Sequence, residues 1–153
     1  MTTWDEYIAR GLPGRLEAAR RGENPTVIAR LESGWAVLGD SQLLPGYALL
    51  LADPEVESLE ALAEAQQMTF LAEMTRLGRA IQAATGCQRV NYGIFGNYDP
   101  YLHAHIWARY AWEDEERRQH PVWLYAAEER FAPDALFDVQ RHAELLERVR
   151  SLL

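Results

Sequence analysis

Short apolar runs separated by turn residues occupy positions 26 to 51 of the chain. Residues 26–32 are β-branched at their start and partly alternating, and Ser33-Gly34 indicates a tight turn before a second apolar run over residues 35–38. After a further loop, Pro45-Gly46 opens a third run over residues 47–51. Three such runs joined by short turns predict an antiparallel meander.

A long helical pattern follows the meander. Asp53-Pro54-Glu55 has the residues of a helix start, and Gly86 is a suitable C-cap, so we expect a helix from there to about Ala84. The apolar residues at 70, 74, 77 and 81 are spaced by four, three and four positions. This spacing predicts one apolar stripe that packs on a sheet.

Shorter helices are predicted at both ends of the chain. Thr3 and Glu6 have the capping-box spacing at the start of a helix over residues 3–10, and a second helical piece is expected over residues 12–21. A terminal helix is expected over residues 134–153, where apolar positions recur at helical spacing.

Two further strands are predicted after the long helix, over residues 89–95 and 102–110. The elements together predict an α+β fold: an antiparallel sheet of about five strands, a long helix packed on it, and N-terminal and C-terminal helices. We expect one domain over residues 1–153. Its parts are a helical extension (1–25), a core (26–110), and a charged loop with the C-terminal helix (111–153).

The last predicted strand carries the candidate chemistry. Side chains two apart share a face of a strand, so Tyr101, His103, His105 and Trp107 point one way. The opposite face is apolar and suits a core. Two imidazoles and a phenol on one face can exchange protons or attack phosphorus near neutral pH. Upstream, Gly93 and Gly96 permit close approach of the backbone to a ligand.

Composition narrows the class of protein. The net charge of −8 argues against a nucleic-acid polymer or an anionic membrane surface as partner. Cys87 is the only cysteine, which excludes an internal disulfide and fits a reducing compartment. No signal-peptide pattern and no apolar stretch of membrane-spanning length is present in the sequence, so we expect a cytoplasmic protein without a membrane partner.

Three interpretations of the histidine pair stay open from the residues alone. The two rings can be ordinary residues of a half-exposed strand. They can be two ligands of a metal site, with His120, Cys87 or Asp99 arriving from elsewhere, although their spacing does not require it. They can also form a nucleophilic site, in which an imidazole attacks a phosphate and water resolves the adduct. Asn97 lies just upstream as a donor for phosphate oxygens.

Several motifs resemble those of the histidine triad (HIT) superfamily. The stretch from Tyr101 to Arg109 is similar to its His-φ-His-φ-His-φ-φ motif, which is commonly followed by Pro-Arg. Asn91-x-Gly93-x-x-Gly96-Asn97 resembles Asn-x-Gly-x-x-Gly-Gln, and Pro45-Gly46-Tyr47 resembles the start of the Pro-Gly-His strand. The resemblance covers roughly residues 26–110, and the order of the elements also fits.

The resemblance implies a function and a set of site residues. It makes His103 the nucleophile on a nucleotide α-phosphate, with His105 in support. The phosphate and substrate contacts that it implies are Asn97, Asn91, Gly96, Asp40 and Arg109. It also implies a nucleotide ligand, no metal or other cofactor, and a homodimer in which the terminal helix takes part.

The chain departs from the superfamily pattern in ways that leave alternatives. Tyr101 replaces the first histidine, and a phenol is a poorer proton shuttle at neutral pH. We still expect Tyr101 to be a catalytic residue that donates a hydrogen bond to a phosphate or to the leaving group. Tyr47 replaces the histidine of Pro-Gly-His, and Ala108 replaces the proline of Pro-Arg. A shifted register makes His105 the nucleophile but loses the match to Arg109. The sequence therefore predicts a HIT-like nucleotidyl hydrolase or transferase. The alternatives are a catalytically weak nucleotide-binding or phosphate-binding protein on the same fold, and a His-ligated metalloprotein.

Overall fold

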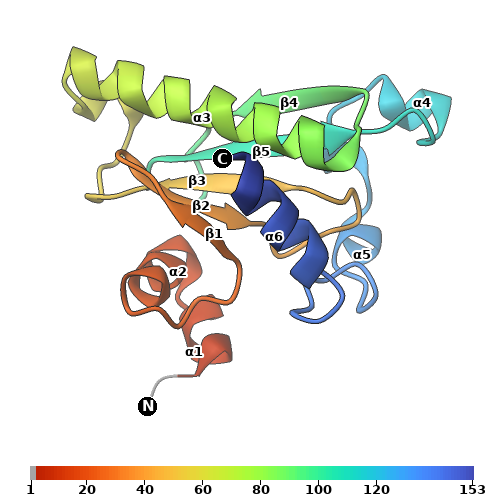
Figure 1. Cartoon of the computed structure of the whole chain (residues 1–153), viewed down its shortest axis with the longest axis horizontal. Helices are drawn as coiled ribbons and strands as arrows, with labels where there is room; N and C mark the ends of the chain where they lie inside the picture. The colour runs from red at the N-terminus through yellow and green to blue at the C-terminus, as the bar shows by residue number, and fades with distance from the viewer. Residues whose placement is uncertain (1–2) are drawn as a thin grey trace.

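The computed structural model describes residues 3–153 and contains a five-stranded antiparallel sheet with helices on both sides (Figure 1). The strands are β1 (Val27–Arg30), β2 (Gly34–Leu38), β3 (Ala48–Ala52), β4 (Arg89–Gly93) and β5 (His103–Arg109). The helices are α1 (Trp4–Ile8), α2 (Gly11–Arg20), α3 (Glu64–Thr85), α4 (Glu115–Arg118), α5 (Ala127–Arg130) and α6 (Ala143–Leu152), with 3-10 turns η1 (Leu59–Ala61) and η2 (Val122–Leu124). The predicted α+β class and five-stranded antiparallel sheet are confirmed.

The histidine strand lies inside the sheet, whose order is β1-β2-β3-β5-β4. The predicted meander over residues 26–51 is present as β1, β2 and β3. β3 pairs with β5 so that Leu49 lies opposite His105 and Leu51 opposite His103. The Pro-Gly strand and the histidine strand are therefore direct neighbours.

The long helix covers one face of the sheet, and α1 and α2 lie on the opposite side (Figure 1). The stripe on α3 packs as its spacing predicts: Phe70, Leu77 and Ile81 are fully buried. They meet the apolar face of β5, where Ala104 and Ile106 are also fully buried. Burial of each large side chain contributes roughly 1.5–3 kcal/mol. This packing leaves the histidine face of β5 free to line a site.

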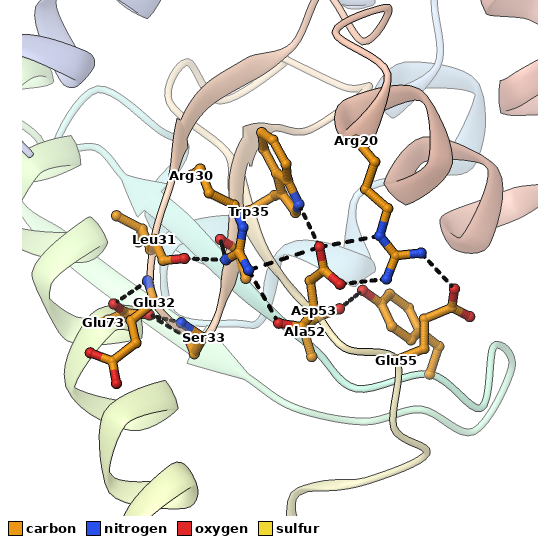
Figure 2. Close-up of polar contacts among 12 residues, drawn as sticks. Arg20, Arg30, Leu31, Glu32, Ser33, Trp35, Ala52, Asp53, Glu55 and Glu73 are labelled. Atoms are coloured by element: carbon orange, nitrogen blue, oxygen red, sulfur yellow. Dashed lines mark hydrogen bonds and ion pairs between the residues drawn. The ribbon is translucent and has the colours of Figure 1, made fainter.

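The start of the long helix was predicted wrongly. α3 begins at Glu64, and Asp53-Pro54 is a cis peptide bond directly after β3. The Asp53 carboxylate caps no helix, because it accepts hydrogen bonds from Arg20 and from Nε1 of Trp35 at 2.9 Å (Figure 2). These contacts, with the guanidinium of Arg20 first, lower the pKa of Asp53. Asp53 therefore fixes α2 to the end of the sheet.

A second polar contact in Figure 2 fixes α3 to the sheet. The buried carboxylate of Glu73 accepts the backbone N–H groups of Glu32 and Ser33 at 2.9 and 2.8 Å. It thereby satisfies two donors of the turn between β1 and β2. These backbone donors replace the hydrogen bonds to water that the carboxylate loses on burial.

The terminal helix is shorter than predicted, since α6 begins at Ala143. The preceding segment pairs instead with the connection between β2 and β3. The Gln42 N–H donates to the Ala135 carbonyl at 2.6 Å, and the Phe137 N–H donates to the Asp40 carbonyl at 2.8 Å. These backbone contacts compete with helix formation. The packed face of α6, around the buried Val149, lies against α3 and β1 of the same chain.

The charged segment 111–120 is exposed along most of its length, as the sequence predicts for a solvated loop or one exposed helical turn, and Glu113 is the exception. It contains α4, and its Glu113 side chain is completely buried against Arg109. No helix among residues 3–153 is both long enough and apolar enough to cross a bilayer.

Candidate active site

The histidine face of β5 forms the floor of a cavity of about 560 Å³. The cavity is lined mainly by apolar and aromatic side chains, with a few polar and charged ones. These residues are Gly11, Leu12, Arg15, Val37, Leu38, Asp40, Ser41, Leu43, Leu44, Tyr47, Leu49, Phe95, Gly96, Asn97, Tyr98, Asp99, His103, His105, Trp107, Val122, Trp123, Arg130 and Phe131. A cavity of this size is typical of small-ligand sites.

The two histidines are joined in one chain of hydrogen bonds. Nδ1 of His103 lies 2.6 Å from the carbonyl oxygen of Tyr101, and its Nε2 lies 3.1 Å from Nε2 of His105. Nδ1 of His105 lies 2.7 Å from the Tyr47 hydroxyl. His103 is only 6 % exposed but lines both this cavity and a smaller one of about 210 Å³.

One assignment of protons satisfies all three contacts when both rings are neutral. A carbonyl oxygen can only accept, so Nδ1 of His103 carries the hydrogen and its Nε2 carries a lone pair. Nε2 of His105 must then donate to that lone pair, which leaves Nδ1 of His105 to accept from Tyr47. In this arrangement the N–H of His103 is backed by a carbonyl oxygen, which stabilises the positive ring that attack produces, whereas the lone pair of His105 is held by the Tyr47 hydroxyl. The geometry therefore favours His103 over His105 as nucleophile.

The surroundings of His105 and Tyr47 keep both side chains in the protonation states that this assignment requires. Burial, followed by the neighbouring His103, lowers the pKa of His105 to about 4. Burial is also the main cause that raises the pKa of Tyr47, so its hydroxyl keeps its proton and donates. His105 also stacks on Trp107, with ring centroids 4.8 Å apart. The ring is thus held neutral and in a fixed orientation.

The low pKa of His105 predicts a loss of stability in acid. Between the unfolded value of 6.5 and about 4, the unfolded chain binds a proton that the folded chain does not. Stability therefore falls as pH falls through this window, by about 3 kcal/mol for this group. We expect the free-energy difference between wild type and His105→Gln in urea unfolding to shrink by about that amount between pH 7 and pH 4. Parallel stability curves for the two proteins would contradict this.

Tyr47 is a site residue that the sequence interpretation missed as a partner of the histidines. In the sequence it stands out only as a departure from Pro-Gly-His. Its ring stacks on Trp107 and lies against Gly39, where an added Cβ would come within 2.2 Å of the ring. The alternation of β3 was the available signal, because Tyr47 and Leu49 point to the same face as His105.

Three of the predicted phosphate and substrate residues lie at the cavity: Asn97, Gly96 and Asp40. Gly96 has a φ of 76°, which favours glycine, and turns the chain after β4. Asp40 forms an ion pair with Arg15, and the Leu12 N–H donates to Asp99 at 3.2 Å. The helical extension therefore forms one wall of the cavity, which the sequence did not indicate.

Arg109 and Asn91 lie elsewhere, in a second cavity beside β4. Arg109 is buried, pairs with Glu113 at 2.9 Å, and donates to Oδ1 of Asn91 at 3.1 Å. Its prediction as a phosphate contact is corrected, because its donors are used within the scaffold. Tyr101 does not line the 560 Å³ cavity above the histidine face: its hydroxyl donates to the Ala52 carbonyl, and burial raises its pKa.

A metal site would need at least a third ligand beside the histidine pair. Within residues 3–153, no group of three or more His, Cys, Asp and Glu side chains is arranged to hold a metal ion. Cys87 is buried and does not line the cavity. The metalloprotein alternative therefore finds no support in this geometry.

The central histidine strand, the neighbouring Pro-Gly strand and the helix on the opposite face define the fold of the histidine triad superfamily, and this chain has that fold. A histidine triad protein from Sinorhizobium meliloti 1021 superposes with a TM-score of 0.71 at 21 % identity, over 88 % of this chain and 94 % of that one. One from Bradyrhizobium japonicum has a TM-score of 0.66 at 26 % identity, over 87 % and 93 %.

A hypothetical histidine triad nucleotide-binding protein from Sulfolobus tokodaii has a TM-score of 0.67 at 15 % identity, over 90 % of this chain and 89 % of that one. No protein-family model and no curated protein sequence matches the chain. The resemblance inferred from the motifs is thus confirmed through the fold.

Proposed function

We propose that the protein is a nucleotidyl hydrolase or transferase that acts on a nucleoside phosphate derivative through His103. The observation that carries this proposal is the Nδ1 contact of His103 with the Tyr101 carbonyl, which leaves Nε2 as the nucleophilic nitrogen beside a ligand-sized cavity. Suitable substrates are dinucleoside polyphosphates and nucleoside phosphoramidates. The aromatic and aliphatic wall offers an apolar surface for the base.

The reaction proceeds in two displacements at one phosphorus. Nε2 of His103 attacks the α-phosphorus, the new P–N bond forms, and the P–O or P–N bond to the leaving group breaks with its electron pair. Water then attacks the same phosphorus, and the electron pair of the P–N bond returns to Nε2. Overall one water gives its hydroxyl to phosphorus and a proton to the leaving group. If an acceptor other than water attacks, the nucleotidyl group is transferred.

The neighbouring groups stabilise the charge on the His103 ring and bind the phosphate oxygens. The Tyr101 carbonyl stabilises the charge that develops on the His103 ring, through the hydrogen on Nδ1. When Nε2 is taken up by phosphorus, the N–H of His105 is released to bond a phosphate oxygen. Asn97 and the turn at Gly96 are the adjacent groups for the remaining oxygens.

Trapping of the intermediate tests the proposal. The protein is mixed with adenylated and guanylated polyphosphates and phosphoramidates and quenched in alkali, which preserves a P–N bond. Mass spectrometry is expected to show one added nucleotidyl group, and fragmentation of the peptide that contains His103 and His105 should locate it on His103. Turnover with no adduct, or an adduct on another residue, would overturn the mechanism.

Tyr47→Phe should slow formation of this adduct. The substitution removes one hydrogen bond, worth about 0.5–1.5 kcal/mol, that holds His105 in the required tautomer. We expect a three- to tenfold fall in the single-turnover rate, since 1.36 kcal/mol is a factor of ten. Tyr92→Phe is the matched control, because Tyr92 faces α3 at Gly78. An equal effect of both substitutions would show that the Tyr47 contact has no specific role.

A second candidate function is nucleotide binding without turnover. It is favoured by the contact of the Tyr101 hydroxyl with the Ala52 carbonyl, which leaves the first triad position without a proton donor to the ligand. Tight nucleotide binding without His103-dependent product would establish it. A homodimer and a cytoplasmic location stay predictions, and light scattering of the purified protein tests the former.

A further inference from the structure

One cation of the cavity wall, Arg130, forms no ion pair within residues 3–153. Its Nε donates to the carbonyl of Tyr125 at 3.1 Å. Its guanidinium lies over the ring of Phe131, 5.4 Å from the centroid, which is within the reach of a cation–π contact. In the described part of the chain its two Nη groups have no hydrogen-bond acceptor. A guanidinium with free Nη donors is suited to bidentate contact with a phosphate.

The backbone holds Arg130 in place at the cavity. The Ser41 hydroxyl donates to the Arg130 carbonyl at 2.6 Å, and the Ser41 backbone forms a bridge with Leu136. With the contacts of Gln42 and Phe137 described above, these bonds join the segment after α5 to the connection between β2 and β3. The guanidinium is therefore attached to a fixed wall, so that its binding costs little ordering of the chain.

The charges around Arg130 favour an added anion. The charged side chains that line the cavity are Arg15, Arg130, Asp40 and Asp99. Asp40 is paired with Arg15, and Asp99 accepts the Leu12 N–H. The group formed by Arg15, Asp40 and Arg130 thus has one positive charge in excess.

We infer that Arg130 binds a second phosphate of the ligand, carried on the 2′ or 3′ oxygen of the ribose whose 5′-phosphorus lies at His103. The inference rests on the proposed function and extends it. Asp40 and Ser41 follow β2, which is separated from β5 by β3 alone. Two strand spacings amount to about 10 Å. The guanidinium of Arg130 also acts electrostatically on the Tyr47 hydroxyl, which lies 2.7 Å from Nδ1 of His105. One ribose that carries two phosphates can bridge groups at such a separation.

Titration calorimetry with defined probes tests this subsite. The probes are the 5′-monophosphates, 2′,5′-bisphosphates and 3′,5′-bisphosphates of adenosine and guanosine. We expect one of the two bisphosphates to bind at least about tenfold more tightly than the monophosphate with the same base, as one charge-assisted bidentate contact provides. In Arg130→Gln the ratio of bisphosphate affinity to monophosphate affinity should fall to about one. Arg130→Lys should retain part of this ratio, because lysine keeps the positive charge but lacks the paired donors of the guanidinium.

Arg79→Gln is the matched control, because Arg79 lies exposed on α3, the helix on the opposite face of the sheet. It removes the same charge and should leave the ratio unchanged. A ratio near one in the wild type, or a ratio that survives in Arg130→Gln, would overturn the inference. If the monophosphates bind and the His103 adduct forms while the ratio is one, only the second subsite fails. If none of the probes binds the folded protein, the proposed function fails with it.

Discussion

His103→Asn should abolish turnover of every nucleotide substrate, by at least about a thousandfold, and should remove the trapped nucleotidyl adduct. The substitution deletes Nε2 of His103, the proposed nucleophile, together with the Nδ1 that the Tyr101 carbonyl holds. Affinity for the nucleoside monophosphates should change by less than about tenfold, because the cavity wall and the turn at Gly96 remain.

The controls for His103→Asn separate chemistry from folding. His142→Asn replaces a histidine that stacks on Phe137 outside the cavity, and it should keep full activity. His103→Gln, with circular dichroism and urea unfolding of all variants, shows whether lost activity reflects lost structure. Residual turnover within tenfold of wild type in a folded His103 variant would rule out nucleophilic attack by this ring.

Glu113→Ala should destabilise the protein by about 3–5 kcal/mol, because it leaves the buried guanidinium of Arg109 without an anion. Glu113 accepts Nη2 of Arg109 at 2.9 Å, the Tyr110 N–H at 2.7 Å and the Tyr125 hydroxyl at 2.7 Å. Burial alone would raise the pKa of Glu113, but these donors, Arg109 first, outweigh it and lower the pKa. The carboxylate therefore remains charged in the folded state.

Urea unfolding at pH 7 measures this effect. Glu129→Ala is the matched control, because Glu129 pairs with Arg117 at the surface, where an ion pair contributes about 0–1 kcal/mol. The double variant Arg109→Met with Glu113→Leu should recover much of the loss, since neither buried charge is then left unpaired. A loss below about 1 kcal/mol for Glu113→Ala would mean that water reaches Arg109.

The sheet and the histidine face could be predicted from the sequence because they rest on local periodicity. Alternation over residues 101–107 determined which side chains share a face, and the spacing of the apolar residues of α3 determined its packed side. The start of α3 could not be predicted this way. Asp53-Pro54 has the residues of a helix start, but Arg20 and Trp35 take the carboxylate, and these partners are distant in sequence.

The same limit applies to the site. The motif led to His103, His105 and the turn at Gly96, which are close in sequence. Arg15 and Arg130 lie on α2 and α5, and Tyr47 directly precedes β3, so these three cavity residues come from segments that are distant in sequence. Arg109 fits the motif, yet its role depends on Glu113. The burial of Glu113 could not be predicted, because its neighbours in the sequence are charged and typical of an exposed segment.

The walls of the cavity come from segments outside the sheet, whereas its floor consists of strand residues. Exchange of the α1–α2 hairpin or of the segment around α5 would therefore reshape the entrance while leaving the reactive ring in its place. New ligand preferences can be engineered, or acquired in evolution, by grafting these peripheral segments onto an unaltered sheet.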